Sequence, residues 1–243
     1  MTHAITLRPR MLRRGEEEDG FLLTADAFRV GSARRGLDVL VSIIGLVMAA
    51  PIVAVAAGLV LLMDGRPVFF KQSRIGELGR AFTMSKLRSM CVVVSGPEVT
   101  TCSDVRVTRL GGVLRRFSID ELPQLWHVLR GQMTLVGPRP ESMALASQYP
   151  QSCRIVLMAR PGLTGPGQLS YRERSATPPP SWPDVDTWYL QILVPLRTGA
   201  DLEYLKRPTL LRTMRWLVVT ALCVAGMVDV QRAVHAPADT ATS

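Results

Sequence analysis

Apolar residues gather in one long run near the start of the chain. From residue 39 to residue 63 the sequence reads VLVSIIGLVMAAPIVAVAAGLVLLM, without a single charge. As one helix this run would be roughly 37 Å long, enough to cross the apolar core of a bilayer, which is ~30 Å thick. Pro51 stands at the midpoint of the run, where it removes a backbone hydrogen bond and therefore bends or breaks the helix.

Basic residues flank this run on both sides. Arg34 and Arg35 precede it, and Arg66 and Lys71 follow it. A helix that spans a membrane keeps its basic flank on the cytoplasmic side. Two basic flanks therefore fit a re-entrant helix, which enters the membrane, breaks at Pro51 and leaves by the same face. The residue pattern alone leaves this re-entrant helix and a single spanning helix equally open.

The rest of the chain mixes short apolar periods with turn residues, which is typical of a small domain with both strands and helices. The pattern predicts an α+β fold, mainly helical, attached to the membrane helix. The apolar run at 216–228 is too short to span a bilayer and suits an amphipathic helix that lies in the membrane interface or packs on the core. Strands are expected at 67–72 and 82–86, helices at 118–129, 141–149, 188–193, 202–206 and 210–230, and a loop at 161–167.

Changes in composition divide the chain into four parts. We expect a tail with basic and acidic clusters over 1–33, the membrane helix over 34–65, one soluble domain over 66–230, and a flexible tail over 231–243. No internal repeat is found. The residues at 175–183 (SATPPPSWP) are too rich in proline for a helix or a central strand.

Composition narrows the function classes. An apolar fraction of 47% excludes a disordered chain. The 4 cysteines are far apart and form no C-x-x-C pair, which argues against a disulfide framework or a zinc site. The net charge of +9 indicates an acidic partner, which could be nucleic acid, a phosphorylated substrate or an anionic membrane.

The most informative stretch for chemistry is 115–141, RRFSIDELPQLWHVLRGQMTLVGPRPE. Ser118 and Glu121 have the spacing of a capping box, so a helix should begin at Ile119 with Asp120 and Glu121 in its first turn. The two acids could merely suit the positive end of that helix. Alternatively, a carboxylate there should keep a low pKa and stay ionised, and it could act as a nucleophile toward phosphorus or as a magnesium ligand.

Cations surround these acids in the sequence. Arg115 lies one turn before them, and Arg139 follows in a rigid Gly-Pro-Arg-Pro turn. Lys86 and Arg88 alternate on an expected strand, either as a solvated edge or as further phosphate contacts. Carboxylates together with phosphate-binding cations are what phosphoryl transfer needs. His127, in the middle of the expected helix, is interpreted as a packing residue.

Longer motifs connect these residues. Arg34, Arg35 and Asp38 form the pattern of two basic residues and an aspartate three positions later. The run F-x-Q-x-R-x-G-x-x-G-x-x-F spans 70–82, KLRSM spans 86–90, SIDELPQLWHVLRGQMTLVGPRP spans 118–140, and RPGLTG spans 160–165. Gln168 and the pair Asp201 and Tyr204 follow. With these motifs, from residue 34 to residue 220, the chain resembles the bacterial sugar transferase family.

These enzymes are monotopic polyprenyl-phosphate phosphoglycosyl transferases, which begin the assembly of exopolysaccharides, O-antigens and related glycans. The chain departs from the family pattern at four positions. Ala50 replaces the serine before the helix-breaking proline, His127 replaces an asparagine, Thr134 replaces a serine, and Thr213 replaces an aspartate near the last helix.

The resemblance implies a reaction and a place for it. The enzyme would transfer a sugar-1-phosphate from a nucleotide-sugar, with uridine as the nucleotide, to undecaprenyl phosphate. Asp120 would be the nucleophile that forms an aspartyl-phosphosugar intermediate, and Asp120 and Glu121 would bind Mg²⁺. Lys86, Arg115 and Arg139 would steady phosphates, with Arg88 as a further candidate from its place on the strand.

The resemblance also favours the re-entrant form of the membrane helix. The catalytic domain would then lie on the cytoplasmic face of the bacterial inner membrane, held to the anionic lipid surface. Other glycosyltransferases of glycan assembly are possible partners. Because few residues precede the membrane helix, the chain is expected to be the minimal catalytic form of the family.

Two other function classes make different predictions. A non-catalytic scaffold for glycan assembly would tolerate Asp120→Asn and would turn over no nucleotide-sugar. A membrane-tethered nucleic-acid binder would need a basic recognition helix, but 119–129 offers no Arg or Lys and only His127. We therefore expect an enzyme that does not bind nucleic acid.

Overall fold

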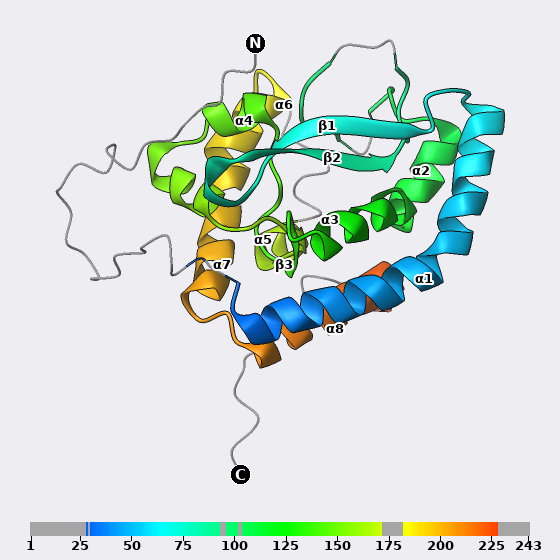
Figure 1. Ribbon diagram of the computed structural model, residues 1–243. Helices are drawn as coiled ribbons and strands as arrows, with labels where there is room; N and C mark the ends of the chain where they lie inside the picture. The colour runs from blue at the N-terminus through cyan, green and yellow to red at the C-terminus, as the bar shows by residue number, and fades with distance from the viewer. Residues whose placement is uncertain (1–27, 29, 93–95, 102–103, 172–181, 228–243) are drawn as a thin grey trace.

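The computed structural model describes residues 28, 30–92, 96–101, 104–171 and 182–227. Within them the fold is mainly helical with two small sheets, as the α+β prediction requires (Figure 1). The tail predicted over 231–243 lies outside the described residues, as do most of the tail over 1–33 and most of the proline-rich stretch. The helical elements are α1 (Ser32–Met63), η3 (Glu77–Gly79), α2 (Arg109–Arg116), η4 (Ile119–Gln124), α3 (Leu125–Leu129), α4 (Met143–Ser147), η5 (Gln151–Met158), α5 (Pro166–Ser170), α6 (Val185–Trp188), η7 (Tyr189–Leu193), α7 (Val194–Lys206) and α8 (Leu210–Val224).

The long apolar run forms α1, with Pro51 inside it. The helix is continuous, so the predicted break is a bend instead. Figure 1 shows its first part running along one edge of the molecule beside α8 and its second part turning upward toward α2. A proline is the usual cause of such a bend because it lacks the N–H that would complete the helix ladder. Of the described helices, α1 alone is long and apolar enough to cross a membrane.

One side of α1 packs on the domain and the other is bare. Ala56 and Val60 are buried against Leu87 and Leu114, which belong to β2 (Ala81–Leu87) and α2. Large apolar side chains cover the outer side, among them Leu40, Ile43, Ile44, Val47, Met48, Ile52, Val55, Leu59, Leu61, Leu62 and Met63. An exposed apolar surface of this extent marks a membrane or protein interaction site. Together with the length of α1 it indicates that the protein associates with a membrane.

The N-terminal end of α1 is fixed to the domain by buried polar side chains. Arg34 donates a hydrogen bond to the carbonyl of Val136 at 3.0 Å, and Arg35 donates to two carbonyls at the end of α3 at 2.6 Å. Asp38 accepts hydrogen bonds from the hydroxyl of Thr134 at 2.8 Å and from the next backbone N–H at 3.0 Å. The motif of two basic residues and an aspartate thus joins α1 to α3 and to β3 (Thr134–Val136).

The C-terminal end of α1 is fixed to the same domain. Arg88, just after β2, donates to the backbone carbonyls of Asp64 and Gly65, the latter at 2.9 Å. The hydroxyl of Thr108 donates to the carboxylate of Asp64 at 3.0 Å. Both ends of α1, a helix long enough to cross a bilayer, therefore contact the same domain.

Two strands near α1 pack against η4, the helix that carries Asp120 and Glu121. As predicted, β1 (Phe69–Ile75) and β2 pair antiparallel around the Gly76–Gly79 turn. Phe70 lies opposite Lys86, and Arg74 lies opposite Phe82. Side chains directly opposite in an antiparallel pair share one face. That face is turned toward η4 and α3, where the ring of His127 meets Phe82 at a centroid distance of 5.7 Å.

The expected loop at 161–167 is structured, so that prediction was wrong. Gly162–Thr164 forms β4, which pairs parallel with β3, and Pro166 begins α5. Gly162 has no space for a side chain, because a Cβ atom there would lie 2.1 Å from the backbone nitrogen of Gly137. The glycines that suggested a loop instead allow two backbone segments to come into close contact.

The C-terminal helices follow the prediction with altered borders. The expected helices at 188–193 and 202–206 belong to one helical run of α6, η7 and α7, and the helix expected at 210–230 is α8, which ends at Val224. The helix expected at 141–149 is the shorter α4. The exposed face of α8 includes Leu211, Met214 and Val218, which agrees with an amphipathic helix.

Candidate active site

The dyad Asp120–Glu121 lies in the first turn of a 3-10 helix, η4, rather than an α-helix. The predicted capping box is absent. Ser118 has φ +55°, in the left-handed region, and its side chain makes no cap hydrogen bond. A non-glycine residue in this conformation is strained, and such strain is often found beside functional residues. The strained residue makes the sharp turn that joins α2 to the dyad.

The helix before the dyad is held against β2 by a glycine. Thr108 caps α2 by accepting a hydrogen bond from Gly111 N at 2.9 Å. A Cβ atom on Gly111 would lie 2.0 Å from the carbonyl oxygen of Ser89, so only glycine permits this approach. Arg115, one turn further along α2, is thereby brought near Lys86 of β2.

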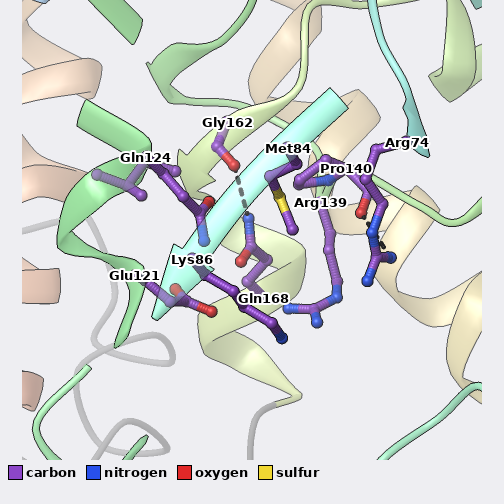
Figure 2. A pocket seen from close by; sticks show the side chains of 10 residues that line it. Arg74, Met84, Lys86, Glu121, Gln124, Arg139, Pro140, Gly162 and Gln168 are labelled. Carbon is purple, nitrogen blue, oxygen red and sulfur yellow. Dashed lines mark hydrogen bonds between the residues drawn. The ribbon is translucent and has the colours of Figure 1, made fainter. Parts of the chain in front are cut away.

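A pocket opens between η4, the β1–β2 face and the segment after β3 (Figure 2). In Figure 2 the ends of Lys86 and Arg139 point into the same space, Glu121 lies beside Lys86, and the amide of Gln168 is directed to the carbonyl of Gly162, to which it donates a hydrogen bond at 3.3 Å. Three cations and one carboxylate thus face a small polar cavity. The lining residues are Arg74, Met84, Lys86, Glu121, Gln124, Arg139, Pro140, Gly162, Leu163 and Gln168.

Asp120 is not among the lining residues; it is buried beside Glu121, which lines the pocket, with only 4% of its surface exposed. Burial and the charge of Glu121 raise its pKa from 3.8 to about 6, although Lys86 and Arg115 act in the opposite direction. The predicted low pKa was therefore wrong, because loss of hydration outweighs the nearby cations. At neutral pH the carboxylate is still mostly ionised. Its poor solvation makes it a better nucleophile than an exposed aspartate.

Lys86 shows the opposite effect on a cation. Burial lowers its pKa to about 8, against the opposing charges of Glu121 and Asp120, while Arg115 and Arg139 lower it further. Its ammonium lies 5.6 Å from the centre of the Phe70 ring. A lysine crowded by two arginines and withdrawn from water gains from a phosphate, which supplies the missing negative charge.

The two predicted arginines also converge on this region. Arg115 has its Nη1 atom buried without a hydrogen-bond partner among the described residues. The side chain of Arg139 is 43% exposed in the pocket, and its Nε lies 3.8 Å from the carboxylate of Glu141. A buried donor that no protein atom satisfies is uncommon in a folded protein, so a ligand oxygen is its natural partner.

Other predicted residues do not reach the pocket. Arg88 is buried and holds the end of α1, so its geometry gives no support to the prediction that it contacts phosphate. His127 packs, as interpreted from the sequence. Its Nε2 accepts a hydrogen bond from Ser85 N, which makes Nδ1 the donor to Gln132 at 2.8 Å. Pro51 lies within the apolar helix, outside the pocket lining.

Sequence reasoning did not assign a role to several pocket residues. Arg74 and Gln168 fall within the motifs, but only the strand pairing and the short β4 show that they share the pocket with Lys86. Glu141 and Tyr189, which are distant in sequence, form a hydrogen bond with each other, and Glu141 also pairs with Arg139. The signal for Glu141 was its place immediately after the Gly-Pro-Arg-Pro turn.

The site suits a magnesium ion only if substrate oxygens complete it. Among the described residues no group of three or more His, Cys, Asp or Glu could hold a metal. Asp120 and Glu121 supply two adjacent carboxylates, and Mg²⁺ is commonly held by one or two carboxylates together with substrate phosphates and water. The donor set therefore fits a substrate-bridged Mg²⁺.

Comparison with known proteins agrees with these features. The family model of bacterial sugar transferases matches residues 30–226. A UDP-N-acetylgalactosamine-undecaprenyl-phosphate N-acetylgalactosaminephosphotransferase from Aeromonas hydrophila is 34% identical over 174 residues, 70% of this chain and 41% of that protein. The exopolysaccharide production protein ExoY from Sinorhizobium fredii is 38% identical over 159 residues, 58% of this chain and 70% of that protein.

A UDP-glucose:undecaprenyl-phosphate glucose-1-phosphate transferase from Caulobacter vibrioides is 44% identical over 143 residues, 56% of this chain and 53% of that protein. The matched part thus spans less than two thirds of the Aeromonas and Caulobacter proteins. The family model, in contrast, covers α1, the dyad and the whole pocket. The chain belongs to the bacterial sugar transferase family.

Proposed function

We propose that the protein transfers a sugar-1-phosphate from a UDP-sugar to undecaprenyl phosphate, as the first membrane step of exopolysaccharide or O-antigen-type glycan synthesis. The observation that carries this proposal is the pocket itself. The buried, poorly solvated carboxylate of Asp120 lies near Lys86 and Arg115, and Arg139 lies near Lys86 in the pocket, so these cations can hold a diphosphate. The names of the relatives support the two substrates.

The reaction follows from the charges. A carboxylate oxygen of Asp120 attacks the β-phosphorus of the UDP-sugar, a P–O bond forms, and the bond to the leaving UMP breaks. An oxygen of the lipid phosphate then attacks the same phosphorus, forms the diphosphate and restores the Asp120 carboxylate. Lys86, Arg115 and Arg139 hold the phosphate oxygens in place, which lowers the cost of bringing one anion against another.

Asp120 and Glu121 would hold Mg²⁺ together with phosphate oxygens of the donor, where the cation offsets charge that develops on the leaving group. Two carboxylates in adjacent positions support this assignment. Removal of divalent cations with EDTA should therefore stop UMP release, and Mg²⁺ should restore it. If EDTA leaves the rate unchanged, Mg²⁺ has no part in the reaction.

The re-entrant topology is proposed on the contacts at the two ends of α1. Arg34 and Asp38 fix one end to β3, and Arg88 fixes the other end through Gly65. If α1 spanned the bilayer, these two ends would be separated by ~30 Å of hydrocarbon, with one domain required on both sides. A helix bent at Pro51, with both ends at the cytoplasmic face of the inner membrane, avoids this conflict.

Labelling can test the topology. In a cysteine-free background, Ala33→Cys places a thiol in the first turn of α1 and Arg66→Cys places one after its end, both at exposed positions. A maleimide that does not cross membranes should leave both thiols unlabelled in intact spheroplasts and label both after lysis. Labelling of one site only in intact spheroplasts would indicate a spanning helix.

The function is tested by supplying purified protein with Mg²⁺, undecaprenyl phosphate and a panel of UDP-sugars, and by measuring UMP release. Release with a UDP-sugar, abolished by Asp120→Asn, is the expected result. A folded protein that releases no UMP with any donor would favour the second candidate, a non-catalytic scaffold of glycan assembly. That candidate is favoured by the broad apolar face of α1, which other membrane proteins could also contact.

A further inference from the structure

Arg139 is the most exposed cation of the pocket, yet its orientation depends on a residue with almost no exposure. The carboxylate of Glu141 is 2% exposed and lies 3.8 Å from the Nε of Arg139. Figure 2 shows the guanidinium directed toward the end of Lys86.

Glu141 is itself fixed by a neighbour from a distant part of the chain. The hydroxyl of Tyr189 donates a hydrogen bond to Oε1 of Glu141, and Arg197 donates to the Tyr189 oxygen at 3.1 Å. Burial raises the pKa of Tyr189, so its hydroxyl remains a neutral donor over the working pH range. The buried carboxylate of Glu141 is therefore held by the hydroxyl of Tyr189 while it also pairs with Arg139.

Tyr189 reaches this position because the helix is irregular there. It begins η7, a π-helical turn, in which the N–H of Val194 bonds the carbonyl of Tyr189, five residues back. Pro195 follows and has no N–H to continue an α-helical ladder. Such π-turns redirect side chains and occur frequently at functional sites.

The backbone around Arg139 is also fastened. The carbonyl of Glu141 accepts a hydrogen bond from Ile75 N at 2.9 Å, and the carbonyl of Pro140 accepts one from Arg74 at 3.2 Å. The segment that carries Arg139 is therefore tied to β1 by one main-chain hydrogen bond and by one from the guanidinium of Arg74, neither of which involves the Glu141 side chain. A change of that side chain should alter the direction of Arg139 more than the path of the backbone.

We propose that Glu141, held by Tyr189, is a positioning residue that directs the guanidinium of Arg139 toward the phosphates of the nucleotide-sugar. The inference rests on the proposed function and assigns it a residue outside the dyad and its cations. The charge of this one carboxylate acts on two arginines of the pocket, Arg74 and Arg139. Without its charge, Arg139 is repelled by Arg74 and loses its preferred direction.

The test compares Glu141→Gln and Tyr189→Phe with two matched controls. Glu77→Gln removes the charge of another glutamate that pairs with an arginine, Arg160, at 2.8 Å outside the pocket lining. Tyr204→Phe removes another buried hydroxyl, which bonds Thr213 at 2.8 Å. UMP release gives kcat and KM for the donor, and thermal unfolding reports whether each variant is folded.

We expect Glu141→Gln to lower kcat/KM for the donor on the order of 10- to 100-fold, because small displacements of a phosphate-holding group have effects of that size. Tyr189→Phe should lower it less, and both controls should stay near the parent value. In an Arg139→Ala background, Glu141→Gln should cause no further loss, because the residue acts through Arg139.

Each outcome decides the matter. An equal loss from Glu141→Gln with and without Arg139, or a loss that follows the unfolding temperature, would reduce Glu141 to a structural role and overturn the inference. If Glu141→Gln does not fold, Tyr189→Phe in both backgrounds carries the same test. Parent and controls that release no UMP would overturn the proposed function and this inference with it, whereas active controls with an unaffected Glu141→Gln overturn only the inference.

Discussion

Charged side chains are buried at two places in the molecule, and the two places differ in how the charges are paired and in how far the pKa values are displaced. At the junction of α1 and β3, Arg34 and Arg35 donate to backbone carbonyls and Asp38 accepts two hydrogen bonds. At the pocket, the pKa values of Asp120 and Lys86 are displaced toward the neutral forms. Burial also raises the pKa of Asp38, but its hydrogen bonds to Leu135 and Thr134 oppose that rise.

The difference separates a structural cluster from a functional one. The junction uses charge to join elements that are distant in sequence, and its partners are supplied by the protein, apart from the Nε of Arg34. The pocket brings together a poorly solvated acid, a poorly solvated lysine and an arginine nitrogen without a partner. Unpartnered buried atoms occur at both places, so the pocket is distinguished by its exposed cation, Arg139, and by the displaced pKa values of Asp120 and Lys86.

The largest expected effect separates the two aspartates by activity. Asp120→Asn should reduce turnover by about 10⁴-fold or more, because it removes the nucleophile. Asp38→Asn keeps an acceptor for Thr134 and should retain most activity per folded molecule. UMP release normalised to folded protein measures both. Comparable losses from the two substitutions would remove the distinction between the clusters.

The free energy of unfolding should rank the two aspartates in the reverse order, with substitution of Asp38 more damaging than substitution of Asp120. Asp38→Ala leaves the hydroxyl of Thr134 and a backbone N–H buried without an acceptor, which should destabilise the fold by about 2–4 kcal/mol. Asp120→Asn should stabilise the metal-free protein at pH 8 by on the order of 1–3 kcal/mol. The pKa of Asp120 is about 6 in the folded state, above its ordinary value of 3.8. The free energy of unfolding is therefore highest, as far as this group is concerned, below pH 3.8, and this advantage is lost as pH rises through 6.

Thermal unfolding in detergent with EDTA, at pH 5 and pH 8, checks this order. The advantage of Asp120→Asn should shrink at the lower pH, because the parent carboxyl is then mostly protonated. A destabilised Asp120→Asn at both pH values would mean that Asp120 is a structural residue like Asp38.

The pH dependence of activity sharpens the account of the pocket cations. Since the pKa of Lys86 is lowered to about 8, its charge is lost as pH rises through that value, and kcat/KM should fall up to tenfold per unit above it. Lys86→Arg should keep its charge and hold activity to a higher pH, even if its maximum is lower. A basic limb that stays in place in Lys86→Arg would assign the limb to another group.

The smallest expected effect concerns backbone strain. Ser118 and Leu78 both have positive φ, but only Ser118 precedes the dyad. Replacing either by glycine should change stability by about 1 kcal/mol or less, since the relief of strain is offset by the greater freedom of the unfolded chain. Ser118→Gly should also lower kcat severalfold by loosening the dyad, whereas Leu78→Gly should not. Equal kinetics in the two variants would show that the strain at Ser118 has no functional role.

The sequence was sufficient for features that depend on local pattern. The charge-free run predicted α1, alternation predicted β1 and β2, and the spacing of Asp120, Glu121, Lys86, Arg115 and Arg139 predicted a shared site. Features that depend on contacts between distant segments were missed or wrong. The glycines of 162–167 form β4 and α5 because Gly137 approaches Gly162, and the pKa of Asp120 rises because β2 and α2 bury it.

The same limit explains Glu141 and Tyr189. Their contact depends on a π-turn before Pro195, which no local period announces. The residues that fix α1 to the domain were visible as a motif, but their partners in α3 and β3 required the fold. Local rules therefore predicted the residues proposed to react, whereas the residues proposed to orient them emerged only from packing.

The central claim is that Asp120 carries the sugar phosphate between donor and acceptor. The direct measurement is intact-protein mass spectrometry after mixing the enzyme with a reactive UDP-sugar and Mg²⁺ in the absence of the lipid acceptor. The account predicts an added sugar phosphate on Asp120 that disappears when undecaprenyl phosphate is supplied and never forms in Asp120→Asn. An adduct that persists in Asp120→Asn, or full transfer to the lipid by that variant, would contradict it.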